Sequence, residues 1–245
     1  MTSPDPYARL AGVYDELVVD PCHSDWADFL QRMWAEADVR RVLDVCCGSG
    51  LMTVQLRDRG FRVTGVDASP AMLARARELL GADADLRLAV LPDLPVDETY
   101  DAAVSTLDGL NYLSLPDFRL TLRAIAEHLR PGGWLVFDIH TAAVLRLLTE
   151  NPLIAGEQDG STYALSSIVD VSTGRCATTI MLTAADPERS FVEEHVQYVH
   201  RDEDVQMALE DGGFAVIAVT DEYTDEPTGP DSLRATWVAR KNADA

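Results

Sequence analysis

Arg41-Val-Leu-Asp-Val-Cys-Cys-Gly-Ser-Gly-Leu-Met-Thr53 is the stretch that decides the fold of this 245-residue chain. Residues 42–45 form a mainly apolar run, long enough for a buried strand and too short for a helix. Gly48 and Gly50 end that run, and a helical pattern follows over residues 51–58. A strand, a glycine turn and a helix in this order bring backbone N–H groups and a helix N-terminus close to a ligand. A side chain at either glycine would block that approach.

Two acidic residues indicate which kind of ligand this strand-turn-helix would bind. Residues 61–66 resemble a second strand, and Asp67 at its end can accept hydrogen bonds from a ribose diol. Thr53 stands where the dinucleotide fingerprint Gly-x-Gly-x-x-Gly has its third glycine. Asp44 lies inside the first strand, where a pyrophosphate needs no acid but a ligand with a positively charged amino group does. The pattern therefore favours a ribose-bearing ligand with such a group over a dinucleotide.

Four ordered motifs resemble those of one enzyme family. Val42-Leu-Asp-Val-Cys-Cys-Gly-Ser-Gly50 and Val63-Thr-Gly-Val-Asp-Ala-Ser-Pro-Ala-Met-Leu73 resemble the first and second motifs of class I S-adenosylmethionine-dependent methyltransferases. Asp108-Gly-Leu-Asn-Tyr-Leu113 and Leu129-Arg-Pro-Gly-Gly-Trp-Leu-Val-Phe-Asp138 resemble the family's segments after strand four and around strand five. The resemblance covers about residues 7–140. It implies a small-molecule N- or O-methyltransferase that uses S-adenosyl-L-methionine, releases S-adenosyl-L-homocysteine and needs no metal.

The resemblance also implies which residues hold the cofactor. Asp44 and the carbonyls near Cys46 and Ser105 would face the amino group of its methionine part. The other implied contacts are Tyr14 at the methionine end, Gly48 and Gly50 at the close approach, Asp67 on the ribose, Ala68 and Met72 beside the adenine, and the N–H of Leu91 on the adenine ring. Relatives usually end strand three in an aspartate that binds adenine. Val90 or Leu91 stands there in this chain, and Asp93 could replace the missing acid if its loop bends back.

We expect a Rossmann-like α/β fold with a mostly parallel seven-stranded sheet, helices on both faces and an antiparallel last strand. Period-two alternation at residues 163–169, 178–182 and 191–199 indicates a small antiparallel β insertion between strand five and the last helix. The whole chain would form a single methyltransferase domain. Its expected parts are an N-terminal helical lid over 1–37, a cofactor-binding core over 38–150, the insertion over the substrate site at 151–200, and a closing helix and strand pair over 201–245.

The substrate is expected between the lid, the loop after strand four and the insertion. Trp26 stands where relatives often carry an aromatic residue near the pocket, although core packing explains it equally well. Asp108, Asn111 and Tyr112 follow strand four, at the sheet edge where open α/β sheets bind ligands. Contact with cofactor and substrate is one interpretation of this loop, and loop capping by Asp and Asn is the other.

Two histidines are candidate bases for the acceptor's proton. His140 lies at the tip of strand five, on the ligand-bearing edge of the sheet. His195 shares one face of an inserted strand with Glu193, and relatives with an inserted sheet often carry this Glu-x-His pattern. Both histidines and Glu193 would line the substrate site, where Glu193 could hold or bind a cationic group. The alternatives are a surface or helix-capping role for His140 and a surface pair for Glu193 and His195.

Net charge and composition limit the classes of molecule that this protein is expected to bind. Lys and Arg number 20 against 41 Asp and Glu, which gives a formal charge of −21. Such a surface repels polyanions, so nucleic acid and anionic membranes are poor partners, whereas a neutral or cationic small molecule is compatible. The chain has no run of 18 apolar residues, no signal-peptide pattern at residues 1–6 and no zinc-like spacing of its four cysteines. We expect a cytoplasmic monomer or homodimer.

Transfer of a methyl group from S-adenosylmethionine to a nitrogen or oxygen of a small molecule is therefore the expected function. An amino sugar or another secondary-metabolite intermediate is the first expected acceptor, with nitrogen slightly favoured. An NAD(P)-dependent oxidoreductase and a non-catalytic cofactor-binding protein are the alternatives. Asp44 and Thr53 count against the first alternative, and the missing aspartate after strand three favours the second.

Overall fold

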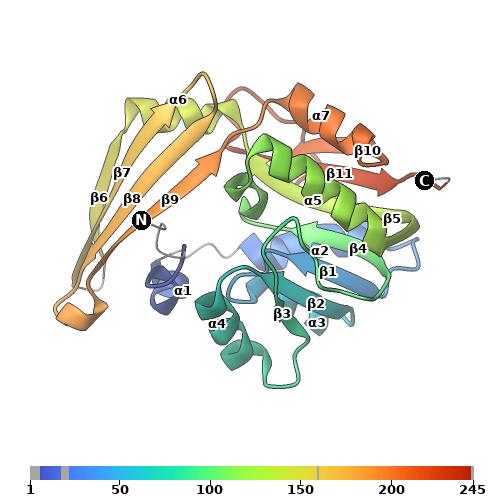
Figure 1. The fold of residues 1–245 in the computed structure, drawn as a ribbon, viewed down its shortest axis with the longest axis horizontal. Coiled ribbons are helices and arrows are strands. Elements are labelled where there is room, and N and C mark those ends of the chain that lie inside the picture. Colours follow the sequence, from blue (N-terminus) through green and yellow to red (C-terminus); the bar gives the residue numbers. More distant parts are fainter. Residues whose placement is uncertain (1–5, 18–21, 159, 244–245) are drawn as a thin grey trace.

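A mostly parallel sheet positions the site. The computed structural model describes residues 6–17, 22–158 and 160–243, and its central sheet has the strand order β10-β11-β5-β4-β1-β2-β3 (Figure 1). The strands are β1 Arg41–Val45, β2 Arg62–Asp67, β3 Leu86–Leu88, β4 Tyr100–Ser105, β5 Leu129–His140, β10 Phe214–Asp221 and β11 Arg234–Lys241. Strands β1 to β5 are parallel, and β11 is antiparallel to both of its neighbours. The expected fold class is confirmed.

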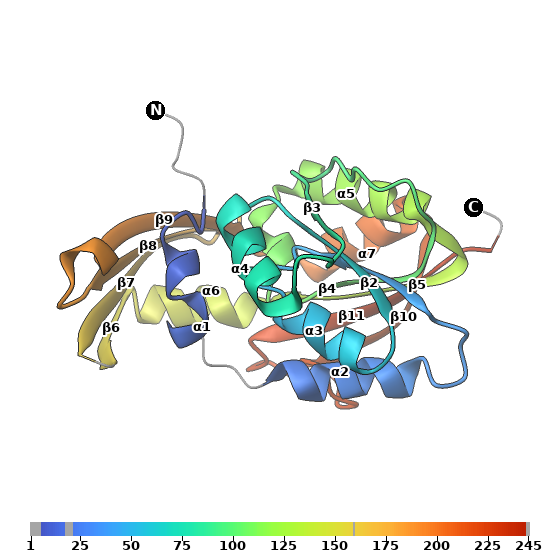
Figure 2. The same cartoon turned by 90° about the horizontal axis from the view of Figure 1, so that it is seen from below.

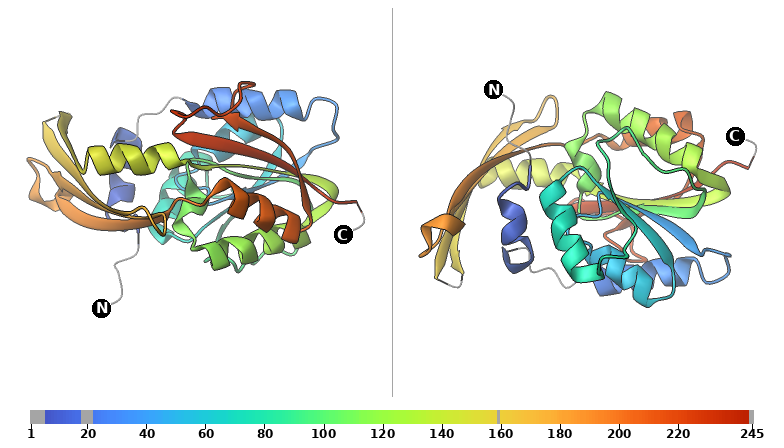
Figure 3. Two further views of the ribbon diagram at one scale, coloured as in Figure 1. Left: turned by 90° about the horizontal axis from the view of Figure 1, so that it is seen from above. Right: turned by 60° about the horizontal axis from the view of Figure 1, so that its bottom comes forward.

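Helices cover both faces of this sheet. The helices and short 3₁₀ turns of the core are α2 Cys22–Met33, α3 Leu51–Asp58, α4 Pro70–Leu80, η2 Gly109–Tyr112, α5 Leu115–His128 and α7 Asp202–Asp211. Helices α2 and α3 lie on one face, and α5 and α7 lie on the other (Figures 2 and 3). Helix α5 buries Phe118, Leu122 and Ile125, a spacing that puts side chains on one face of a helix. The buried faces hold the strands so that the carboxyl ends of β1, β2 and β4 meet at one edge.

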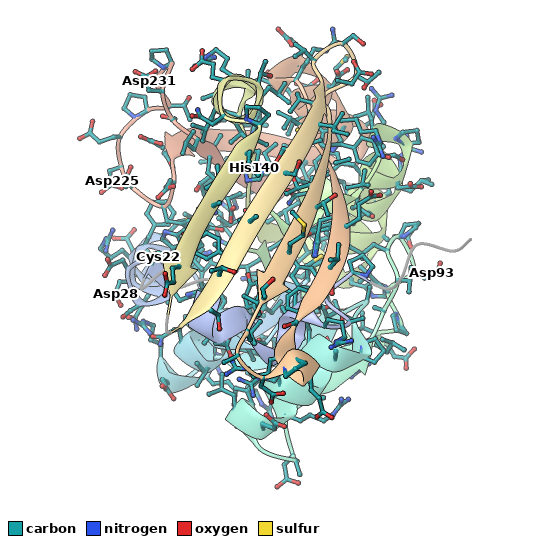
Figure 4. All side chains as sticks on the ribbon, turned by 90° about the vertical axis from the view of Figure 1, so that its left-hand side faces the viewer. Cys22, Asp28, Asp93, His140, Asp225 and Asp231 are labelled. Carbon is teal, nitrogen blue, oxygen red and sulfur yellow. The ribbon has the colours of Figure 1, made fainter. Side chains whose placement is uncertain are left out.

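A second sheet stands apart from the central one. It has four antiparallel strands in the order β6-β7-β8-β9 and is reached through helix α6. The bounds are α6 Ala142–Glu150, β6 Leu153–Gln158, β7 Ser161–Asp170, β8 Arg175–Thr183, η3 Pro187–Arg189 and β9 Phe191–Tyr198. We call this sheet the roof. Figure 4 looks onto its outer face, with His140 behind it. The insertion lies between β5 and α7 as expected.

The first described segment, residues 6–17, lies between the roof and α4 (Figure 2). We call it the lid segment. Its helical spacing predicts one helix, but it forms the 3₁₀ turn η1 Leu10–Gly12 and the short helix α1 Tyr14–Leu17. The backbone of Tyr7 has a φ of +68°, which takes it out of a helix. The rest of the expected lid includes residues 1–5 and 18–21, which lie outside the described residues.

Three local features of the structure have separate physical causes. Strand β3 spans three residues instead of 84–91, because it pairs only with β2 and the chain then turns at Pro92, which has no N–H for a strand ladder. Strand β6 does not show the period-two alternation of apolar and polar residues, because adjacent Leu153 and Ile154 are both exposed. In the acidic segment 221–231, Tyr223 is buried against α2, while residues 224–231 are exposed.

Candidate active site

The glycine turn after β1 has the conformation that close approach requires. Gly48 has a φ of +55°, and Gly50, with a φ of +87°, is the N-cap of α3. A Cβ atom on Gly50 would lie 3.2 Å from the Cβ of Ala76 in α4, so α4 packs closely against this turn. The backbone conformation and the close packing both explain why glycine occupies these positions.

Asp67 joins the glycine turn to the next helix. Its Oδ2 accepts a hydrogen bond from the N–H of Gly48 at 2.8 Å, and its Oδ1 accepts one from the N–H of Ser69 at 2.8 Å. The hydroxyl of Ser69 in turn accepts the N–H of Met72 at 3.4 Å, and Pro70 begins α4, as the sequence predicts. The carboxylate of Asp67 is therefore held at the tip of β2.

Asp44 is a buried carboxylate with one oxygen unused. The hydroxyl of Thr53 donates to its Oδ2, while its Oδ1 has no hydrogen-bond partner among the described residues. Burial raises the pKa of Asp44 to about 7, although the hydrogen bond from Thr53 opposes the shift. A buried oxygen of this kind is costly unless a donor meets it, so the position suits a cationic amino group.

A cavity with an empty volume of about 860 Å³, including its open mouth, lies beside these groups. Of the predicted site residues, those that line it are Tyr14, Cys46, Gly48, Asp67, Ala68, Met72 and Tyr112. Tyr7 and His23, which the sequence analysis left out of the site, line it too. No lysine or arginine is among the described residues of its wall.

Several predicted residues lie outside this wall. Trp26 is buried in the core and stacks on Tyr223 with ring centroids 4.5 Å apart, which fits the core-packing alternative. Asn111 is fully buried, donates to the carbonyl of Tyr198 at 2.7 Å and accepts the N–H of His140 at 2.9 Å. Asn111 therefore fastens the loop after β4 to β5 and to the roof. The others outside the wall are Asp44, Gly50, Leu91, Ser105, Asp108, His140, Glu193 and His195.

Asp108 is the centre of a polar cluster behind the cavity. Its carboxylate accepts from Gln197 at 2.7 Å and from Arg234 at 3.1 Å, and it lies 3.3 Å from Nε2 of His140. Burial alone would raise the pKa of Asp108, but His140, Arg234 and Gln197 hold it well below its usual value. His140, one of the two predicted bases, is thus turned toward a carboxylate that does not line the cavity.

Asp138 fixes the conformation of the loop after β4, and sequence analysis did not single it out. Leu107 and Asp108 both have positive φ values, of 56° and 51°, which are uncommon for residues with side chains. Asp138 accepts the N–H groups of both at 2.8 Å and the hydroxyl of Tyr223 at 2.9 Å. Burial raises the pKa of Asp138 to about 6, although Arg234 nearby opposes the shift.

The roof contributes a chain of hydrogen bonds that ends at the cavity. Glu193 and His195 face inward on β9, and Oε1 of Glu193 lies 2.9 Å from Nε2 of His195. Nδ1 of His195 lies 2.7 Å from the hydroxyl of Tyr112, which lies 2.8 Å from the hydroxyl of Tyr7. His195 is buried and reaches the cavity only through the two tyrosines.

Glu193 is also bound to the lid segment. Its carboxylate accepts the backbone N–H groups of Tyr7, Arg9 and Leu10, the last two at 2.9 Å and 3.1 Å. Burial alone would raise the pKa of Glu193, but the hydrogen bonds from His195 and from the lid N–H groups hold it below its usual value. Both carboxylate oxygens are engaged in these contacts, so they are not presented to a cationic acceptor as the sequence analysis expected.

Comparison with known proteins shows which proteins this chain is similar to. Residues 42–133 match the methyltransferase domain family. Over 250 residues the chain is 28% identical to the putative methyltransferase YqeM of Bacillus subtilis, covering 96% of this chain and 97% of that protein. Its fold matches a S-adenosylmethionine-dependent methyltransferase from Clostridium acetobutylicum with a TM-score of 0.84, at 24% identity and with 97% and 100% of the two chains covered.

A further solved structure with the same fold is CalS10, an amino pentose methyltransferase from Micromonospora echinaspora, bound to S-adenosylmethionine. The TM-score is 0.71 at 23% identity, with 97% of this chain and 99% of that chain covered. The matched family and these three relatives are all methyltransferases. The matched domain and YqeM favour a methyltransferase over the nicotinamide oxidoreductase and the non-catalytic protein. Among the described helices, none is long and apolar enough to cross a membrane.

Proposed function

We propose that this chain, a class I S-adenosylmethionine-dependent methyltransferase, methylates an amine nitrogen of a small, uncharged or cationic acceptor, with an amino sugar or a similar secondary-metabolite intermediate as its substrate class. The observation that carries the proposal is the chain from Glu193 through His195 to Tyr112, because it ends in the wall of the cavity that Asp67 and Gly48 also line. An amine in water is largely an ammonium ion, so a base beside the methyl donor serves this acceptor directly.

The residues present fit the cofactor. Asp67 would accept the ribose hydroxyls, and Gly48, which lines the cavity and has no side chain, leaves room for the ligand beside the turn. Ala68 and Met72 would flank the adenine, and Asp44, buried outside the described wall, would favour the positive amino group of the methionine part by its charge. The cofactor supplies a methyl group on a sulfonium, whose neutral thioether leaves without help from a metal.

The wall of the cavity favours a cation over an anion. Tyr7, Tyr14 and Tyr112 present aromatic rings, which attract ammonium and sulfonium groups through their faces. No arginine or lysine of the described wall is available to bind a carboxylate or phosphate. The net charge of −21 draws cationic molecules toward the protein and repels anions.

The hydrogen-bond partners assign the protons of the base. Glu193 is held as a carboxylate, so it accepts a hydrogen bond and Nε2 of His195 carries the proton. Nδ1 of His195 is then the acceptor for the hydroxyl of Tyr112. When the acceptor's N–H gives its proton to the cavity end of this hydrogen-bond relay, the hydroxyl proton of Tyr112 moves to His195 and the oxygen of Tyr112 receives a proton in its place. The imidazolium that results is paired with Glu193, and the acceptor's lone pair is free to attack.

Of the two histidines expected as bases, His195 is the one we assign. His140 lies 3.3 Å from Asp108 and is absent from the described wall of the cavity. In this proposal His140 keeps Asp108 in place and takes no proton from the acceptor.

Matched acceptors test the proposal. The purified protein is incubated with S-adenosylmethionine and with an aminodeoxy sugar or the parent sugar that carries a hydroxyl at the same carbon. Formation of S-adenosylhomocysteine is measured, and the product is identified by mass spectrometry. We expect methylation of the amino compound alone. Methylation of the hydroxyl compound alone would contradict the assignment of nitrogen and establish O-methylation.

A further inference from the structure

Tyr7 of the lid segment is the last member of the series of hydrogen-bonded side chains that runs from His195 through Tyr112. Its hydroxyl lies 2.8 Å from that of Tyr112. Its ring packs edge-on against His195 at a centroid distance of 4.9 Å and lies 5.7 Å from the ring of Tyr14. Tyr7 also lines the cavity. Of the hydrogen-bonded side chains from Glu193 to Tyr7, Tyr7 is the one that an acceptor would meet first from the lid side.

The backbone of Tyr7 is held in an unusual conformation. Its φ of +68° is sparsely populated by residues with a Cβ atom and costs free energy that the surrounding structure must offset. Glu193 supplies that offset, because its carboxylate accepts the N–H of Tyr7 together with those of Arg9 and Leu10. The same carboxylate orients His195.

The lid segment is also fastened on the cofactor side. Asp15 accepts the hydroxyl of Ser49 in the glycine turn at 2.8 Å and pairs with Arg75 of α4 at 3.3 Å. The segment therefore connects the roof to the cofactor-binding turn. If it moved away, Glu193 would lose three N–H donors and Tyr112 would lose Tyr7.

From this arrangement we infer that Tyr7 is a catalytic residue and that the base of this enzyme is complete only when the lid segment is docked on Glu193. The inference rests on the proposed function. The acceptor's N–H gives its proton to the oxygen of Tyr7, whose hydroxyl proton passes to Tyr112, and the hydroxyl proton of Tyr112 passes to Nδ1 of His195. One N–H bond breaks, one N–H bond forms on the imidazole, and both tyrosines end as neutral hydroxyls.

The direction of the relay follows from the donors and acceptors. Nδ1 of His195 accepts, so Tyr112 must donate to it, and the remaining interaction of the Tyr112 oxygen is to accept from Tyr7. The oxygen of Tyr7 then presents a lone pair to the cavity. Burial raises the pKa values of Tyr7 and Tyr112 well above their usual values, which keeps both hydroxyls protonated between turnovers.

Tyr7→Phe tests the relay because it keeps the ring and removes the hydroxyl. We expect kcat to fall by about tenfold to about 100-fold, at or below the low end of the effect of a proton-transfer group, with little change in the KM for the acceptor or the Kd for S-adenosylhomocysteine. Tyr163→Phe is the matched control, because Tyr163 packs against the same apolar cluster and is absent from the described cavity wall. An unchanged kcat in Tyr7→Phe overturns the relay, and so does an equal loss of cofactor affinity, which would indicate a structural role.

Docking of the lid is tested without any acceptor. Backbone amide hydrogen exchange at residues 7–10 is compared between the wild type and Glu193→Gln, with Glu194→Gln, on the exposed face of the same strand, as the control. Faster exchange in Glu193→Gln alone is expected, and unchanged exchange contradicts the docking.

The two proposals fail separately. A wild type that methylates only hydroxyl acceptors refutes the choice of nitrogen, and Tyr7→Phe then tests the relay with that acceptor. If the wild type methylates amines and Tyr7→Phe does so at the same rate, the relay is refuted and the proposed function stands.

Discussion

The cofactor half and the acceptor half of this site are built in different ways. On the cofactor side, the polar contacts join residues close in the chain, as between Asp67 and the N–H groups of Gly48 and Ser69. On the acceptor side, Glu193 contacts Tyr7 across 186 residues of sequence. The first half depends on backbone conformation in one β-α-β segment. The second exists only after the lid segment, the loop after β4 and the roof have packed together.

This difference suggests that the halves can be damaged independently. A change on the acceptor side should slow methyl transfer and leave cofactor binding intact, whereas a change at the tip of β2 should weaken cofactor binding directly. Asp138 lies between the halves, because it holds the loop that contributes Leu107 to the cavity and Asp108 to the polar cluster.

The largest effect is expected from His195→Asn. Loss of the proton acceptor should lower kcat by about 100-fold or more, while the Kd for S-adenosylhomocysteine stays within about twofold of the wild type. The rate is measured as formation of S-adenosylhomocysteine with an amine acceptor at saturation. His200→Asn is the control, because His200 is also buried but packs on Phe118 away from the cavity. Equal rates for His195→Asn and the wild type would contradict the claim that the acceptor half of the site supplies the base.

Asp67→Ala should act on the other half. It removes the proposed ribose contact and leaves the N–H groups of Gly48 and Ser69 without their acceptor, so binding of S-adenosylhomocysteine should weaken by about 1–3 kcal/mol. Calorimetric titration measures this, with Asp58→Ala, an exposed acid at the end of α3, as the control. Unchanged affinity in Asp67→Ala would refute the ribose assignment.

Asp138→Ala should weaken both halves moderately. The N–H groups of Leu107 and Asp108 would lose their acceptor and the positive φ values would lose their support, so the free energy of unfolding should fall by about 1–3 kcal/mol. Urea unfolding measures the loss. Asp117→Ala, a change at an exposed position at the start of α5, should cost less than Asp138→Ala, and equal losses would show that Asp138 does not hold the loop.

The smallest effect concerns pH and Asp44. Its pKa in the folded protein is about 7, above the ordinary value, so the folded state keeps a proton that the unfolded state releases. Raising the pH therefore costs stability until the folded group has also ionised, by about 1 kcal/mol between about pH 6 and pH 7. Asp44→Asn should remove this decline, as measured by urea unfolding of the cofactor-free protein at the two pH values. An identical decline in the variant would refute the assignment.

The same contrast explains what could be predicted from the sequence. The glycine turn, Asp67 at the tip of β2 and the cap by Ser69 each depend on a few consecutive residues, and the structure has all three in the expected places. The pairing of Glu193 and His195 on one face of a strand also follows from local periodicity.

Contacts between residues that are distant in the sequence could not be predicted from a local pattern. Trp26 has the pattern of a pocket aromatic and of a core residue alike, and only its stacking on Tyr223 decides between them. Tyr7 looked like one turn of a longer helix, whereas its positive φ and its contact with Tyr112 depend on the roof. His140 and Asp108 lie at the expected edge of the sheet, but Arg234 and Gln197 draw Asp108 away from the cavity.

Calorimetric titration of S-adenosylhomocysteine into the wild type, His195→Asn and Asp67→Ala, with NAD⁺ as the control ligand, tests the account most directly. We predict equal affinity for the wild type and His195→Asn, affinity weaker by about fivefold or more for Asp67→Ala, and no binding of NAD⁺ by any of the three. Absence of binding by the wild type, or an equal loss of affinity in both variants, would contradict the separation of cofactor binding from the acceptor-side base.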